Sequence, residues 1–164
     1  MKQKFTAWSD GSCDNLNPAK PGGAAYVIFD EKGNLFRKSS KGFIGTTNNR
    51  MELLAIISIV NALPPDSHVT IHTDSEYCIK ALLSGHPQAN LDQIAHYHRL
   101  CSERNISVLF KWVKGHAGDE HNEECDLMAR TEYQKMCDDY TPPSTPSRHK
   151  NLAKKKRNKN KSKG

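Results

Sequence analysis

Four acidic side chains lie where predicted strands end or predicted helices begin: Asp10, Glu52, Asp74 and Asp126. Asp10 and Asp74 each end a predicted strand, and the ligand sites of α/β folds lie beyond the carboxyl ends of strands. If the four converge, a carboxylate cluster without cysteine or paired histidine suits hard cations such as Mg²⁺ or Mn²⁺. Two such ions, about 4 Å apart, can drive an in-line displacement at phosphorus.

Each of these acids also has a local explanation. Aspartate is favoured in turns and at helix N-caps, which would account for Asp10 and Asp74. Glu52 follows Asn49 by three residues, which is the spacing of a capping box at the start of an apolar helix. We predict Asp126 in the first turn of the last helix, where the helix dipole favours an acid. Spacing alone therefore leaves both interpretations open.

The elements that must position these acids alternate between strands and helices. Period-two patterns predict strands at residues 4–10, 23–30, 34–43, 68–74 and 105–115. Helical spacing predicts helices at residues 49–63, 75–85 (closed by Gly85), 91–104 and 123–136. The order β-β-β-α-β-α-α-β-α predicts a mixed α/β sheet whose first three strands form an antiparallel meander.

Charge divides the chain into two parts. The 164 residues carry 24 Lys or Arg and 18 Asp or Glu. Nine of the basic residues and none of the acids lie in residues 141–164, so residues 1–140 are mildly acidic. We expect one folded domain over residues 1–140 and a disordered Lys-rich tail over residues 141–164.

The cysteines and the hydropathy limit where the protein works. Five scattered cysteines with no C-x-x-C pair argue against a zinc site or a disulfide scaffold and indicate a reducing interior. No apolar run approaches a membrane span, and the early strand pattern leaves no room for a signal peptide. We expect a monomeric cytoplasmic protein without membrane contact, or a nuclear one if the source is eukaryotic.

Four motifs in one order resemble the type 1 ribonuclease H family, in its bacterial ribonuclease HI form. They are SDGSC…NPAKPGGAAYV, TTNNRMELLA, HTDSEYCI and WVKGHAGDEHNEECDLMAR, and the resemblance runs from about Lys4 to Tyr140. It implies a mixed five-stranded sheet, with three antiparallel and two parallel strands flanked by helices. It also implies Mg²⁺-dependent hydrolysis, with Mn²⁺ as a substitute, of the RNA strand of RNA/DNA hybrids. The expected products carry 5′-phosphate and 3′-hydroxyl ends.

The resemblance gives each acid a role in a site with two metal ions. Asp10 would bridge both ions, while Glu52 and Asp74 would complete the site on the leaving-group side. Asp126 would hold the ion that activates the attacking water. His116, in KGHAG, matches the family's mobile loop histidine, which assists proton transfer or product release.

The resemblance also marks positions that contact the hybrid. Those that would sense the 2′-hydroxyl are Cys13, Asn17, Asn48 and Asn49. Those that would grip a phosphate of the DNA strand are Thr47 and Asn90, although turn and cap chemistry explains Asn49 and Asn90 as well. Glu76 stands where bacterial members carry a glutamine, and a carboxylate cannot donate a hydrogen bond.

Residues 79–104 lack the Lys- and Trp-rich protrusion that holds the hybrid in bacterial relatives. We hypothesise that the basic tail replaces it as an electrostatic holder, with a solubility or localisation tail as the alternative. Two other functions stay open. A hybrid-binding module without catalysis would be expected to lack one of the carboxylates, and other nucleases of the superfamily lack TTNNRMEL and WVKGHAG. We expect a stand-alone enzyme rather than a domain of a polyprotein.

Overall fold

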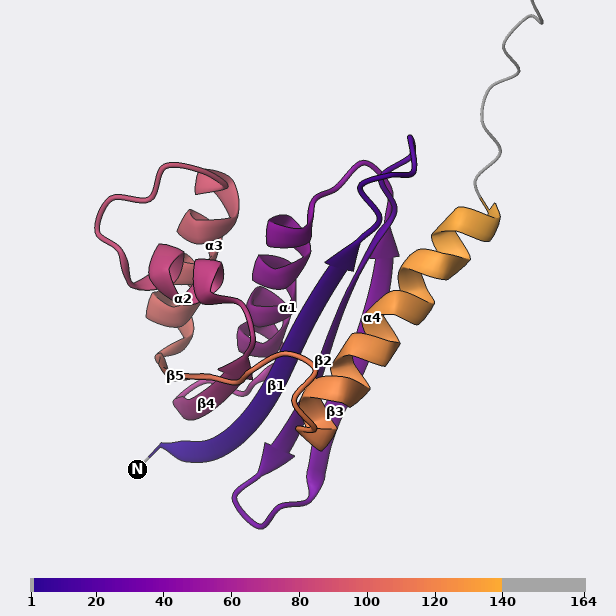
Figure 1. Cartoon of the computed structure of the whole chain (residues 1–164). Coiled ribbons are helices and arrows are strands. Elements are labelled where there is room, and N and C mark those ends of the chain that lie inside the picture. Colours follow the sequence, from indigo (N-terminus) through magenta and orange to yellow (C-terminus); the bar gives the residue numbers. More distant parts are fainter. Residues whose placement is uncertain (1, 140–164) are drawn as a thin grey trace, which may run out of the picture.

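A twisted sheet with helices on both faces makes up the protein in the computed structural model, which describes residues 2–139 (Figure 1). The strands are β1 (Gln3–Cys13), β2 (Gly22–Asp30), β3 (Leu35–Phe43), β4 (Ser67–Thr73) and β5 (Ile106–Trp112). The helices are α1 (Asn48–Ala62), α2 (Glu76–Leu83), α3 (Leu91–Arg104) and α4 (Glu120–Asp139). The predicted order of elements is confirmed, whereas the predicted tail lies outside the described residues.

The sheet has the strand order β3-β2-β1-β4-β5. β2 pairs antiparallel with β1 and with β3, and β4 pairs parallel with β1 and with β5, which confirms the predicted mixed sheet. In the parallel pair of β1 and β4, Trp8 lies opposite His72. Asp10 lies two residues after Trp8, and Asp74 lies two residues after His72. The parallel pairing therefore brings both acids to the same end of the sheet.

Two helices cover opposite faces of the sheet (Figure 1). α1 packs on β1 and β2, and α4 crosses the other face over β1, β2 and β3. The core lies chiefly under α1, whose Leu53, Ile56 and Val60 are fully buried together with Ile28 and Ile71 of the strands. None of the helices in the described part of the chain is long and apolar enough to cross a lipid bilayer.

The first strand is longer than the predicted 4–10. It continues to Cys13 because the residues after Asp10 keep pairing with β2, with Cys13 opposite Gly22. Asp10 itself lies opposite Ala25 inside the ladder. The predicted end of the strand at Asp10 was wrong, and a turn therefore does not account for an aspartate at this position.

The start of α1 also differs from the prediction. The N-cap is Thr47, whose hydroxyl accepts a hydrogen bond from the backbone N–H of Arg50 at 3.2 Å. Asn49 is therefore not the cap, and Glu52 lies too far into the helix to complete a capping box. A hydroxyl two residues before Asn49 satisfies the free N–H groups equally well, so the pattern left the cap ambiguous.

Asp74 does not cap α2, because the hydroxyl of Ser75 does so by accepting from the N–H of Cys78 at 3.1 Å. The helix ends at Leu83, before the predicted Gly85. The aspartate is thus free of a local helix-capping duty. Its side chain is available for contacts with other elements.

The last helix begins three residues earlier than predicted, at Glu120. The carboxylate of Asp119 accepts from the backbone N–H of Asn122 at 2.9 Å and so stabilises this start. Asp126 therefore lies in the second turn and not in the first. The helix dipole acts mainly within the first turn and does not explain an acid at this position.

Candidate active site

Three of the predicted acids converge from three elements. Oxygen atoms of Asp10, Glu52 and Asp74, from β1, α1 and the end of β4, lie within 4.8 Å of one another. Asp10 is 4% exposed and Glu52 is 9% exposed, so two of the carboxylates are nearly removed from solvent. Like charges this close are unfavourable unless a proton or a cation lies among them.

Gly11 makes this convergence possible. A Cβ atom at this position would lie 2.3 Å from the backbone nitrogen of Glu52 and 2.3 Å from the carbonyl carbon of Met51. The start of α1 therefore rests directly on the backbone of β1. Only a residue without a side chain lets the helix approach closely enough to bring Glu52 beside Asp10.

The electrostatics of the cluster follow from its burial. Loss of solvation raises the pKa of Asp10 to about 8, and repulsion from Asp74 adds to the effect. The pKa of Glu52 is also raised well above its ordinary value, first by burial and then by repulsion from Asp10. Without a cation, the folded protein therefore retains protons on this cluster at pH values where isolated carboxylic acids are ionised.

Opposing effects act on the pKa of Asp74. Burial and repulsion from Asp126 raise the pKa of its carboxyl, while the side-chain amide of Asn122 and the His116 ring lower it. Asn122 is 2% exposed, and the sequence interpretation missed it because it placed this residue in a polar loop. An Asp-x-x-Asn spacing at residues 119–122 was the available sign of a helix start that buries the asparagine.

Asp126 stands apart from the other three acids. It does not belong to the group within 4.8 Å, although its charge raises the pKa of both Asp10 and Asp74. One carboxylate oxygen accepts from Nε of Arg130, one helical turn further on, at 3.0 Å. The structure thus brings three predicted acids together and places the fourth beside them.

His116 lies in the loop between β5 and α4. Its side chain is exposed, and its φ of 56° is in the left-handed region that non-glycine residues adopt infrequently. The ring is close enough to lower the pKa of Asp74. Its role in proton transfer or product release stays a prediction.

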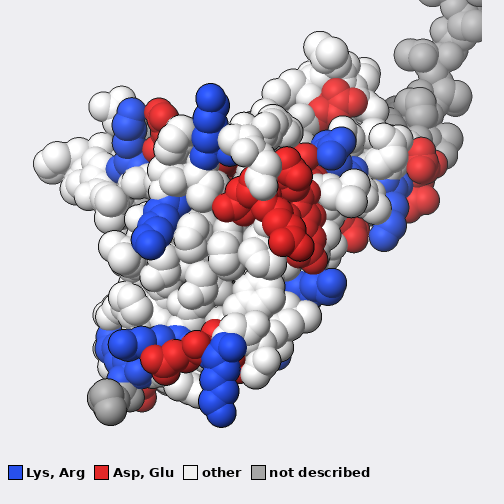
Figure 2. All heavy atoms as spheres, turned by 60° about the horizontal axis from the view of Figure 1, so that its bottom comes forward, with Lys and Arg blue, Asp and Glu red and all other residues white. Residues whose placement is uncertain are grey.

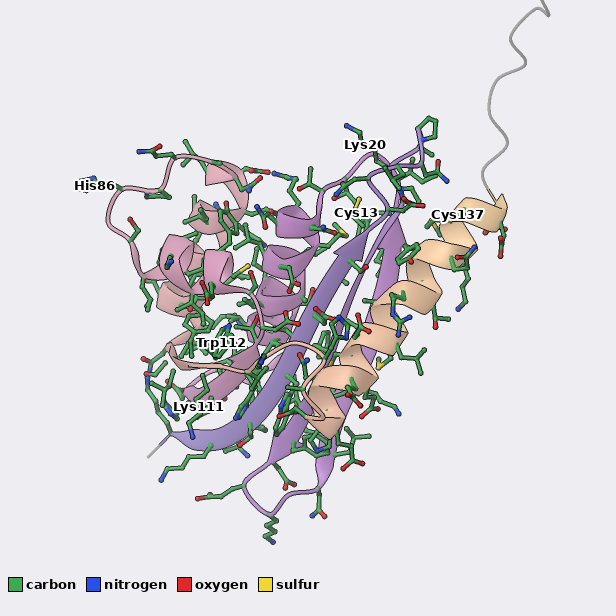
Figure 3. All side chains as sticks on the ribbon, viewed as in Figure 1. Cys13, Lys20, His86, Lys111, Trp112 and Cys137 are labelled. Carbon is green, nitrogen blue, oxygen red and sulfur yellow. The ribbon has the colours of Figure 1, made fainter. Side chains whose placement is uncertain are left out.

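One group of predicted hybrid contacts lies around the end of β1, and we call this group the predicted hybrid rim. The thiol of Cys13 donates to the backbone carbonyl of Thr46 at 3.4 Å, which ties the strand to the segment before α1. The side-chain amide of Asn17 donates to the sulfur of Cys137 near the end of α4 at 3.6 Å. Figure 3 shows Cys13 and Cys137 at the same end of the molecule. The first turn of α1 adds two exposed predicted contacts, Asn48 and Asn49.

Asn90 belongs to a second group. It stands at the N-cap position of α3 but makes no capping bond with its side chain. Its amide instead donates to the Tyr77 hydroxyl at 2.8 Å and accepts from Arg50 at 3.2 Å. Arg50 also forms a 2.8 Å ion pair with Asp92. This network fixes α3 beside the start of α1, where Thr47 is exposed.

Glu76 is the first residue of α2 and lies two positions after Asp74. Its side chain is exposed and pairs only loosely with Lys80, at 4.0 Å. An acid is favoured in the first turn of a helix, which gives Glu76 a sufficient structural reason. The substrate contacts of all these residues stay predictions.

The donor set suits a hard divalent cation. All its ligand atoms are carboxylate oxygens, and Oε2 of Glu52 is buried without a hydrogen-bond partner in the described part of the chain. A buried oxygen left unpaired is costly, and a bound cation would satisfy it. Figure 2 adds that acidic side chains gather in one large patch on the face that holds the start of α4. A polyanion approaching that patch would need cations between the two.

A mixed sheet, with carboxylates from two central strands and from the start of α1 gathered in one cluster, defines an α/β protein with a site suited to divalent cations. The RNase H family model matches residues 2–134, and the chain belongs to this family. It is therefore a hydrolase. Figure 1 shows the fold that this stretch forms, which ends shortly before the last turn of α4.

Curated relatives and solved structures agree with this assignment. The chain is 38% identical over 141 residues to a ribonuclease H of Campylobacter concisus, covering 82% of this chain and 95% of the relative. It is 34% identical over 144 residues to ribonuclease HI of Synechocystis sp., covering 79% and 87%. The crystal structure of LC11-RNase H1 in complex with an RNA/DNA hybrid superposes with a TM-score of 0.69 at 24% identity, covering 81% and 99%, and supports the fold.

Proposed function

We propose that this protein hydrolyses the RNA strand of RNA/DNA hybrids with two Mg²⁺ ions, leaving 5′-phosphate and 3′-hydroxyl ends. The observation that carries the proposal is the convergence of Asp10, Glu52 and Asp74, with Asp126 beside them. The relatives named ribonuclease H, and the hybrid bound to LC11-RNase H1, support the substrate class.

In this mechanism the side chains of the protein would hold the metal ions and position the reacting groups. Asp10, Glu52 and Asp74 would hold the ions, and Asp126 would hold the ion that activates the attacking water. The ions supply Lewis acidity, which lowers the pKa of water and offsets charge at phosphorus. His116, exposed beside Asp74, would assist proton transfer or product release.

Cleavage of matched substrates tests this function. We expect the full chain with Mg²⁺ to cut the RNA strand of a hybrid and to leave duplex RNA and duplex DNA of the same sequence intact. Labelled strands resolved on a denaturing gel report both the substrate and the end chemistry. Equal cleavage of all three substrates would indicate a different nuclease, and binding without cleavage would indicate a hybrid-binding module.

We also propose that the basic tail holds the hybrid. Cys137, in the last turn of α4, contacts Asn17 of the predicted hybrid rim, so the chain leaves the described fold close to that rim. Nine Lys or Arg follow in residues 141–164 without an acid. Several of these charges on phosphates would make binding steeply dependent on salt.

Deletion of residues 141–164 should raise KM for the hybrid and flatten its salt dependence. If about half of the charges contact phosphates, the slope of log affinity against log salt falls by roughly 4. A second variant, with the nine Lys and Arg changed to Gln, keeps the length and should behave as the deletion does. An unchanged KM and salt slope in both variants would refute this role.

A further inference from the structure

Trp112 ends β5 and is 51% exposed. It is one of two tryptophans in the chain, and the other, Trp8, stacks on the His72 ring with 4.3 Å between centroids. A single exposed apolar side chain is ordinary on a protein surface. Trp112 differs because its side chain lies against Asp74 of the candidate active site.

Hydrogen bonds hold the indole in place. Nε1 of Trp112 donates to the backbone carbonyl of Asp74 at 3.3 Å. The next residue, Val113, donates its N–H to the carbonyl of Thr73 at 2.9 Å, so β5 follows β4 to its end. The polar edge of the ring is therefore satisfied inside the protein while part of its surface stays open. A contact group fixed before binding loses little entropy when the ligand arrives.

An exposed lysine, Lys114, follows the ring two residues further on and forms no ion pair within 4.0 Å in residues 2–139. Lys111, directly before Trp112, is also exposed but lies on the opposite face of β5. Figure 3 shows Lys111 and Trp112 together, well away from Cys13 on the predicted hybrid rim. An aromatic surface with a free cation nearby is a common means of holding a nucleic-acid chain.

We propose that Trp112 is a substrate contact that packs on a sugar of the cleaved RNA strand, next to the phosphate that is cut. This inference rests on the proposed function. A group hydrogen-bonded to Asp74 lies near the nucleotides that neighbour the scissile phosphate, because successive nucleotides of one strand are only a few ångströms apart along the helix axis. Bases inside a hybrid are stacked, whereas the wide, shallow minor groove of an A-form helix exposes its sugars. Lys114 then supplies a positive charge for a flanking phosphate.

Tryptophan fluorescence tests the contact directly. The full chain carrying Asp10→Asn, which prevents cleavage, is titrated in Mg²⁺ with a blunt-ended RNA/DNA hybrid, and the same protein with Trp112→Phe is the blank. The difference between the two signals reports Trp112, and we expect it to change as the hybrid binds. A hybrid with a single-stranded RNA end is the second ligand. A change seen only with that ligand would mean stacking on a free base and would overturn the sugar contact.

Affinity measurements distinguish a direct contact between Trp112 and the hybrid from a role in which Trp112 only supports Asp74. By anisotropy of a labelled hybrid, Trp112→Ala should weaken binding roughly 5- to 30-fold, and Trp112→Phe, which keeps an aromatic ring, should weaken it less than about 3-fold. Leu109→Ala is the matched control, because Leu109 is also 51% exposed on β5 but lies on the opposite face of the strand. Its affinity should not change.

Two results would overturn the inference. The first is an unchanged fluorescence difference together with unchanged affinity in Trp112→Ala. The second is a loss of kcat at constant Kd and KM in both Trp112 variants of the cleaving enzyme, which would show that the indole only supports Asp74. Failure of the hybrid to bind any variant would refute the proposed function as well. Hybrid binding without a response from Trp112 would refute this inference alone.

Discussion

Replacement of Asp10 by Asn is expected to abolish hybrid cleavage and to stabilise the metal-free fold. Activity should fall by roughly 10³-fold or more, as when a key transition-state-stabilising group is lost. At pH 8 and above, stability should rise by about 1–3 kcal/mol, because there a neutral amide removes one charge from three clustered carboxylates that repel one another. The amide oxygen can still accept the hydrogen bond from the N–H of Gly11.

The stability gain should depend on pH. The folded-state pKa of Asp10 is raised from 3.8 to about 8, so its contribution to stability is fully present below about pH 4 and is lost as pH rises through 8. Metal-free wild type should therefore lose stability between pH 5 and about 8, and Mg²⁺ should reduce this loss by binding the ionised cluster. The Asp10→Asn protein should show a much flatter curve.

Thermal unfolding with EDTA and with Mg²⁺, from pH 5 to 9, measures these effects. Glu31→Gln is the control, since Glu31 is an exposed acid in the turn between β2 and β3 and its loss should change neither stability nor cleavage. A metal-free Asp10→Asn protein that is less stable than wild type at pH 8 would contradict the repulsion argument. An active one would contradict the metal role.

Gly11→Ala is expected to damage both the fold and the site. The new methyl group would lie 2.3 Å from backbone atoms of Met51 and Glu52, which cannot move aside as a flexible side chain could. Overpacking of this kind costs about 3 kcal/mol or more. It would also push the start of α1 away from β1 and carry Glu52 away from Asp10, and a displacement of about 1 Å can cost 10²-fold in rate.

Unfolding and cleavage assays, together with Mn²⁺ binding by calorimetry, would measure the three consequences separately. Gly85→Ala is the matched control, because a Cβ at Gly85 would meet no atom within 4 Å. That variant should retain activity and change stability by less than about 1 kcal/mol. Wild-type stability and metal affinity in Gly11→Ala would show that α1 does not depend on this close approach.

The order of elements and the sheet could be read from the sequence, because strand and helix periods are local properties of the side chains. The starts of the helices could be predicted less well from the sequence. Several residues near Thr47 could cap α1, and the pattern near Asp119 concealed the first turn of α4, so Asn122 was missed. Cap choice depends on a balance of small free energies that local residue types alone do not resolve.

By itself, the sequence determined which acids were available, the mixed sheet that carries Asp10 and Asp74, and a resemblance that the family match confirms. Only the tertiary structure decided that three acids share one site while Asp126 stands beside them. It also decided that the exposed indole of Trp112 is hydrogen-bonded to the backbone carbonyl of Asp74. These are relations between distant segments, set by strand register and by the close approach at Gly11. Residue spacing along a chain does not encode such distances.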